Sequence, residues 1–287
     1  MKPFAARLLA AAALLSLPVA ASAHRQWMVP SATVFSGKDP WVTIDAAVSN
    51  DLFFADHQPM RLDNVKVWAP DGTEGKIENS VTGRVRSTFE VKLDKPGTWK
   101  IGNSNTSLMG TYKLNGLEGR VGGRGAGGPG GPGGQGDPSR APTVSADQIP
   151  AEASDVKLTE VSNRVEVYVS AGDPTTAIFK PTGKGLEFEP VTHPDELVSG
   201  ETASFRFLID GQPAAGLKVT VVPGGKRYRN DDGARDFTAG PDGIVKIDWP
   251  TAGLYWINAS VTDDKPTAPR ATARRMGYTT TVEVLLP

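Results

Sequence analysis

The chain contains no cysteine among its 287 residues. This absence excludes disulfide bonds, cysteine-ligated zinc, iron–sulfur clusters, a cysteine nucleophile and the cysteine of a lipoprotein signal. Apolar runs are short, and none reaches the roughly 20 residues that a membrane-spanning helix needs. Neither sign of charge is in excess, since 31 basic residues face 32 acidic ones. The net charge of −1 gives no reason to expect nucleic acid or anionic lipid as a partner.

The first 23 residues have the pattern of a secretory signal peptide. Lys2 and Arg7 flank the start of an apolar stretch that ends at residue 20, and the small residues read by signal peptidase end in Ala23. We therefore expect Sec-dependent export to the bacterial periplasm and a soluble mature protein that begins at His24. Cleavage removes two positive charges and no acidic residue, so the net charge changes from −1 to −3.

The rest of the chain has the pattern of β-strands. Apolar residues alternate with other residues at 41–46, 65–68 and 88–93, and turn pairs such as Asp71-Gly72 separate the strands. No window outside the signal peptide keeps a helical period. We predict an all-β protein with two tandem β-sandwich domains of the immunoglobulin-like or carbohydrate-binding-like kind. Strands of the second domain are expected at 202–209, 217–222, 243–249, 253–261 and 277–286.

One glycine- and proline-rich segment, residues 116–150, interrupts the strand pattern. Its composition cannot bury a core, so it is expected to be a flexible loop. Because the flanking strands at 111–114 and 164–169 are expected in one sheet, the loop is interpreted as an insertion within the first domain. The predicted domains are residues 24–182 and 183–287.

Five segments carry a family resemblance: HRQWMVP (24–30), NDLFFADH (50–57), GLEFEP (185–190), DGQPAAG (210–216) and RMGYTTTVEV (275–284). They resemble the DUF4198 family, which is related to the NikM-like periplasmic components of nickel and cobalt uptake. The resemblance extends over nearly the whole mature chain. It implies tandem immunoglobulin-like domains, export and an association with transition-metal uptake.

A histidine at the mature N-terminus offers two nitrogen donors, its α-amine and its ring. Groups of both kinds ordinarily release protons near neutral pH, so a metal ion competes for them easily. A second imidazole would complete a set of three nitrogens, which favours Cu(II) or Ni(II). His57 is the preferred partner of His24 because it lies in the family-like segment 50–57. His193, beside Pro194, is the other candidate.

Other side chains near the two histidines would change the preferred metal. A thioether from Met28 or Met60 would suit Cu(I), whereas Asp51 or Asp56 would favour harder ions such as iron. The metal is therefore expected to be copper, nickel, cobalt or iron. The predicted metal site consists of His24, His57, Met28, Met60 and Asp56.

Two further patterns have a simpler structural interpretation. The sequence Asn230-Asp231-Asp232-Gly233 with Asp236 lacks the ligand spacing of an EF-hand, and it predicts a hairpin turn instead. The tryptophans lie in or beside strand patterns, so we expect core packing rather than a carbohydrate-binding platform. They are Trp27, Trp41, Trp68, Trp99, Trp249 and Trp256.

Together these patterns predict a non-catalytic periplasmic protein that binds a transition metal through His24 and assists its uptake or delivery. The expected partner is a membrane metal transporter or a TonB-dependent receptor. Two alternatives stay open. One is a copper-dependent oxidative enzyme, because polysaccharide monooxygenases use the same brace of a terminal histidine and a second histidine. The other is a structural or adhesion module without a metal.

Overall fold

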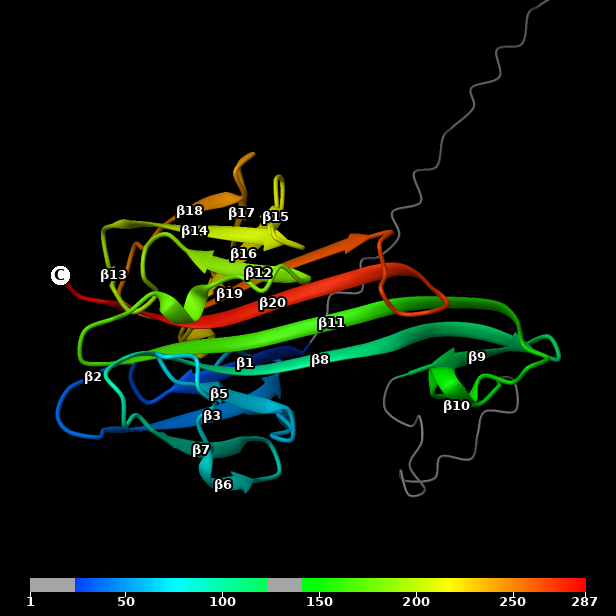
Figure 1. Ribbon diagram of the computed structural model, residues 1–287, viewed down its shortest axis with the longest axis horizontal. Helices are drawn as coiled ribbons and strands as arrows, with labels where there is room; N and C mark the ends of the chain where they lie inside the picture. The colour runs from blue at the N-terminus through cyan, green and yellow to red at the C-terminus, as the bar shows by residue number, and fades with distance from the viewer. Residues whose placement is uncertain (1–23, 123–140) are drawn as a thin grey trace, which may run out of the picture.

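The computed structural model describes residues 24–122 and 141–287, which are almost entirely β-strand (Figure 1). Within these residues, no helix is long and apolar enough to cross a membrane. The predicted all-β class is confirmed. Helical geometry in the described part is confined to the short 3-10 turns η1 (Ala146–Gln148), η2 (Ala177–Phe179) and η3 (Lys226–Tyr228).

The described strands form three layers, with one long central sheet between two smaller ones (Figure 1). The first sheet has the order β1 (Arg25–Pro30), β3 (Trp41–Ser49), β7 (Ser87–Lys92) and β6 (Glu78–Thr82), and β4 (Gln58–Pro59) pairs with β3. The third sheet has the order β12 (Leu186–Pro190), β14 (Thr202–Ile209) and β15 (Gln212–Pro213), and β18 (Ile244–Asp248) pairs with β14.

The central sheet has the order β10 (Thr143–Val144), β9 (Leu117–Val121), β8 (Gly97–Leu114), β11 (Ser154–Ala171), β20 (Ala271–Leu285), β19 (Gly253–Asp263), β16 (Lys218–Pro223) and β17 (Arg235–Thr238). Three short strands join it at the side: β2 (Val34–Phe35) on β11, β5 (Val65–Trp68) on β8 and β13 (Leu197–Val198) on β20.

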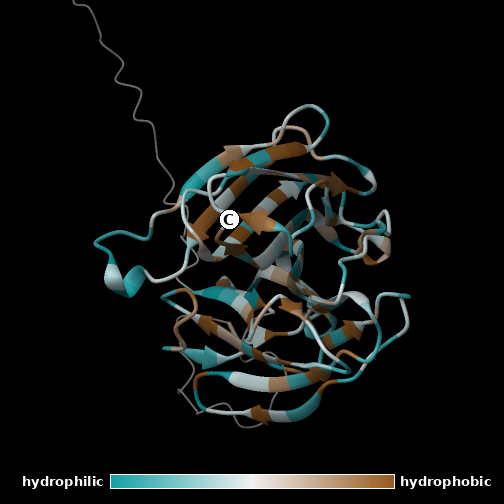
Figure 2. Cartoon of the chain, turned by 90° about the vertical axis from the view of Figure 1, so that its left-hand side faces the viewer, coloured by the Kyte–Doolittle hydropathy of each residue, from teal (hydrophilic) through white to brown (hydrophobic). Residues whose placement is uncertain are grey.

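Alternating burial along the strands explains why these segments form sheets. In β7 every second side chain is buried, from Ser87 to Val91, and β14 alternates in the same way over most of its length. Figure 2 shows the corresponding bands of hydrophobic and hydrophilic residues along the strands. The strands predicted from period-two alternation are present, and β8, β11 and β20 are longer than expected.

Two hydrophobic cores lie on opposite faces of the central sheet. The first is built around residues such as Ile44 and Phe89, and the second around residues such as Phe205. Strand β11 contributes to both, because successive side chains of a strand point to opposite faces. Val167 packs in the first core and its neighbour Tyr168 packs in the second. One strand therefore supports both halves of the molecule.

Strand β11 also joins the halves through its backbone. It pairs antiparallel with β8 and, from Leu158 to Glu166, parallel with β20. Alternation in a sequence gives the two faces of a strand but not its neighbour, so this parallel pairing was not predictable from the pattern. The domain boundary at residue 183 stays a prediction. Ile178 and Phe179 precede this boundary, yet they pack in the second core.

The glycine-rich insertion is structured at both ends. Residues 117–121 form β9 on β8, and residues 143–144 form β10 on β9. The expectation of a flexible loop is wrong there, because Tyr112, Val121 and Leu158 form a small buried cluster that these ends cover. The middle of the insertion, which includes the glycine-rich run 127–134, and the signal peptide lie outside the described residues.

A buried chain of hydrogen bonds lies where β8 and β11 meet the segment before β13. Thr98 and Ser170 are opposite each other on β8 and β11, with their hydroxyl oxygens 2.9 Å apart. Ser170 Oγ donates to Asp195 Oδ2 at 2.6 Å, and His193 Nε2 lies 3.0 Å from Thr98 Oγ1. The backbone N–H of Asp195 donates to His193 Nδ1, which assigns the ring proton to Nε2.

Burial raises the pKa of Asp195 to about 7. The hydrogen bond from Ser170 lowers this pKa, and the nearby charges of Glu196 and Glu283 raise it further. The folded protein therefore keeps a proton on Asp195 that the unfolded chain releases near pH ~4. The stability that this proton provides is complete below that pH and is lost as the pH rises to about 7. Burial lowers the pKa of His193, which gives the opposite dependence.

We predict that Asp195→Asn removes part of the pH dependence of stability. Between pH ~5 and ~8 the ionisation of Asp195 should cost the native protein about 2–3 kcal/mol of unfolding free energy, a loss that the asparagine variant does not suffer. Urea denaturation at several pH values measures both proteins, and the effect of His193 cancels in the comparison. Asp94→Asn, at an exposed position, is the control. Identical pH profiles for native protein and Asp195→Asn would contradict the prediction.

Candidate functional site

The structure brings together two of the histidines that the sequence singled out. The rings of His24 and His57 stack with their centroids 3.9 Å apart and their planes 18° from parallel. The register of the first sheet explains this contact. β1 and β4 lie on either side of β3, where Arg25 is opposite Ser49 and Gln58 is opposite Val48. Each histidine directly precedes one of these strands, so both reach the same end of β3.

The second half of the molecule fixes this end of the first sheet. Arg25 forms an ion pair of 2.7 Å with Asp232, and Lys226 forms one of 2.8 Å with Asp51. The hydrogen bond from Arg25 lowers the pKa of Asp232. The indole N–H of Trp256 also donates to the carbonyl oxygen of Gln26 at 2.9 Å. Both segments that carry the histidines are thus attached to the loop before β17 and to β19.

The other predicted ligands have structural roles of their own. Met28 and Met60, named above as possible thioether ligands, are 0% and 5% exposed and pack in the first core. Alternation along β1 turns Met28 inward. Asp56 accepts hydrogen bonds from the backbone and side chain of Asn50, which close the loop. Within the described residues, no group of three or more His, Asp or Glu side chains is arranged to hold a metal ion.

His193 lies in the buried hydrogen-bond chain described above and not beside His24. Both of its ring nitrogens have partners, and the ring packs edge-on against Phe179. Its role is therefore to hold the junction of the halves together. The acidic sequence at 230–233 forms the turn that was predicted, since Asp231 and Asp232 accept hydrogen bonds from backbone N–H groups two residues on.

The tryptophans divide into two groups. Trp27, Trp99, Trp249 and Trp256 are buried, as core packing predicts, whereas Trp41 is 42% exposed. Trp68 is partly buried, and the ammonium nitrogen of Lys100 lies 4.6 Å from its ring centroid.

The stacked arrangement of His24 and His57 limits what the pair can do. The lone pair of an imidazole nitrogen lies in the plane of its ring, and the two planes here are nearly parallel. A single metal ion can be bound by both rings only after one ring turns about its side-chain bonds. The α-amine of a chain that begins at His24 would be the third nitrogen donor.

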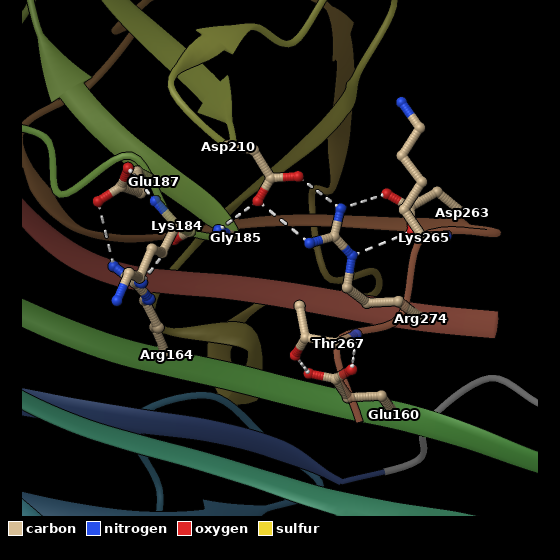
Figure 3. A network of polar contacts seen from close by, with 10 residues as sticks. All are labelled: Glu160, Arg164, Lys184, Gly185, Glu187, Asp210, Asp263, Lys265, Thr267 and Arg274. Carbon is tan, nitrogen blue, oxygen red and sulfur yellow. Dashed lines mark hydrogen bonds and ion pairs between the residues drawn. The ribbon is translucent and has the colours of Figure 1, made fainter. Parts of the chain in front are cut away.

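A second polar region, which the sequence analysis missed, lies on the central sheet (Figure 3). Arg274 of β20 is 6% exposed and binds both oxygens of Asp210 and both oxygens of Asp263. These hydrogen bonds raise the pKa of the guanidinium, and the bond to Asp263 has the largest effect. They also lower the pKa values of the two carboxyls. Nearby, the carboxylate of Glu160 accepts bonds from the loop at Thr267. The sequence signal was an arginine at an inward position of a strand.

Residues 21–263 match the family described as "Domain of unknown function (DUF4198)". No curated protein matches the sequence. Among solved structures, the chain is similar to the D0-D1 domain of intimin (12% identity, 90% of this chain and 97% of that chain, TM-score 0.21) and to alpha-2-macroglobulin from Escherichia coli (13% identity, 90% and 15%, TM-score 0.21). A DUF4785 family protein from Legionella pneumophila is 8% identical over 81% of this chain and 50% of its own, with a TM-score of 0.22.

We predict that Arg274→Met destabilises the fold by about 2–3 kcal/mol, because it leaves two neighbouring carboxylates without their shared cation. The loss is smaller than for a fully buried pair, since Asp210 and Asp263 reach solvent. Arg275→Met is the matched control at the next, exposed position of β20 and should change stability by less than about 0.5 kcal/mol. Urea denaturation measures both variants, and equal midpoints would contradict the prediction.

Proposed function

The chain belongs to the DUF4198 family, and from this premise we propose that it is an exported protein that binds a transition-metal ion through His24 and His57. Its function would be to assist the uptake or delivery of that metal without catalysing a reaction. The observation that supports the proposal is the contact between these two rings, 33 residues apart in the chain. Two of only three histidines meet at the position where signal cleavage would create a free amine.

The donor set favours particular metals. The α-amine and two imidazoles supply nitrogen, and nitrogen donors in a planar arrangement suit Cu(II) and Ni(II). The buried thioethers of Met28 and Met60 pack in the core, which argues against a Cu(I) site built on methionine. Cobalt and iron bind such nitrogen sites more weakly than copper. Copper in the divalent state is therefore the first ion to test.

His24 and His57 are both exposed, so an ion bound there would be within reach of another protein. His24 and the loop that ends at His57 lie at one end of the first sheet, next to the exposed Phe54, whose ring is 4.0 Å from the guanidinium of Arg227. We propose that the protein acts in the periplasm and that the recipient is a membrane metal transporter or a TonB-dependent receptor.

We predict that the mature protein beginning at His24 binds Cu(II) at one site, and that one alanine added before His24 lowers the affinity at least about tenfold. The added residue removes the terminal amine from the chelate and leaves both rings in place. His57→Gln should lower the affinity to a similar degree. Isothermal titration with Cu(II) and Ni(II) measures each protein, and Arg61→Gln, at a side chain that is 89% exposed, is the control.

Two results would contradict this proposal. Equal affinity of the native and extended proteins would show that the terminal amine is not a ligand. Absence of stoichiometric metal binding would favour a structural or adhesion module. A copper-loaded protein that cleaves a polysaccharide in the presence of peroxide would show that the same histidines serve an oxidative enzyme.

A further inference from the structure

A groove with a volume of about 630 Å³ lies on the central sheet, on the same face as the third sheet but beyond the edge of that sheet. Its floor is formed by β8, β11 and β20, and one wall is formed by residues 182–186 together with Asp210. Trp68 of β5 closes one end, where its ring lies over Gly102. The groove contains neither His24 nor His57, so it is separate from the proposed metal site.

The register of β8 and β11 determines which side chains face the groove. Gly102 is opposite Glu166, Ser104 is opposite Arg164, and Thr106 is opposite Ser162. Directly opposed residues of a sheet share one face, and so do alternate residues of a strand. The floor therefore presents a row of small and hydroxyl-bearing side chains beside a row that contains charged ones.

The arginines and carboxylates that line the groove are already engaged within the protein (Figure 3), whereas Lys184 lies exposed at its rim. Arg274 is held by two aspartates, and Arg164 donates to the carbonyl oxygen of Lys184 at 2.8 Å and lies 3.6 Å from Glu187. Glu187 in turn accepts four hydrogen bonds from residues 182–184. Glu166 accepts a hydrogen bond from Tyr168. Charges that are satisfied in this way gain little from an ionic ligand, which would have to displace an internal partner.

Hydroxyl groups, by contrast, remain available on the floor. Among the described residues, the side chains of Ser104, Thr106 and Ser162 have no hydrogen-bond partner. Each hydroxyl can both donate and accept a hydrogen bond. A ligand that bears hydroxyl groups of its own matches such a surface in either direction, and an uncharged one avoids the cost of removing a charge from water.

We propose that this groove binds an uncharged, hydroxyl-rich ligand of the short-oligosaccharide class. Its volume lies within the range of about 300–1,000 Å³ that is usual for small-molecule sites. The floor hydroxyls are carried by the paired strands β8 and β11, whose backbone ladder sets their positions before a ligand arrives. Binding does not require a metal at His24.

The experiment uses the mature protein after removal of metal ions with EDTA. Maltotriose, cellotriose and chitotriose are titrated up to ~10 mM, since shallow polar sites bind in the millimolar range, and citrate is titrated as a charged comparison. Saturation-transfer NMR and calorimetry detect the binding. Ser104→Tyr places a ring over the floor, and Ser107→Tyr places the same ring on the opposite face of β8 as the matched control.

We expect at least one trisaccharide to bind saturably, with affinity reduced about tenfold or more by Ser104→Tyr and unchanged by Ser107→Tyr. A thermal melt of each variant confirms that it is folded, and Ser162→Ala provides a second variant that removes only a hydroxyl. Binding of citrate alone, no saturable binding of any trisaccharide, or equal loss in both tyrosine variants would overturn the proposal. Because the protein is free of metal, none of these results depends on the proposed function of His24.

Discussion

The backbone pairing of β11 is the constraint on which the rest of the structure depends. This strand is bonded to β8 on one side and to β20 on the other, and its side chains enter both cores. A pair of separate sandwiches joined by a linker could change their relative orientation. Here a parallel ladder that extends from Leu158 to Glu166 fixes it. The shared sheet therefore sets the positions of the contacts that the two halves make with each other.

The histidine pair depends on that fixed orientation. His24 and His57 meet because β1 and β4 flank the same end of β3, and the loops beside them are held by the ion pairs Arg25–Asp232 and Lys226–Asp51. Ion pairs that are partly exposed contribute little stability by themselves. Their value here is positional, because a chain terminus is ordinarily mobile unless it is tied down.

The sequence was most informative where a local rule applied. Period-two alternation identified β7 and β14, the cleavage pattern led to His24, and the family-like segment 50–57 led to His57. It failed where the outcome depended on which distant strands become neighbours. Met28 looked like a ligand beside a terminal histidine, but alternation along β1 buries it in the first core. Arg274 was not singled out in the sequence, because its role depends on Asp210 and Asp263, which are distant in the chain or on a neighbouring strand.

The two ends of β11 differ in composition, and the task of joining the two halves explains only the apolar residues near its end. Near its end, Val167 and Tyr168 bury apolar surface on both faces, which is the least costly way for a central strand to join two cores. Toward its start, the face that carries Glu160, Ser162 and Arg164 lines an open groove and needs a network of internal partners to satisfy its charges. Apolar residues covered by a longer third sheet would give a more stable junction, because buried charges cost desolvation energy. A strand that keeps polar residues there gives up stability for an accessible surface, and a ligand is the simplest reason for doing so.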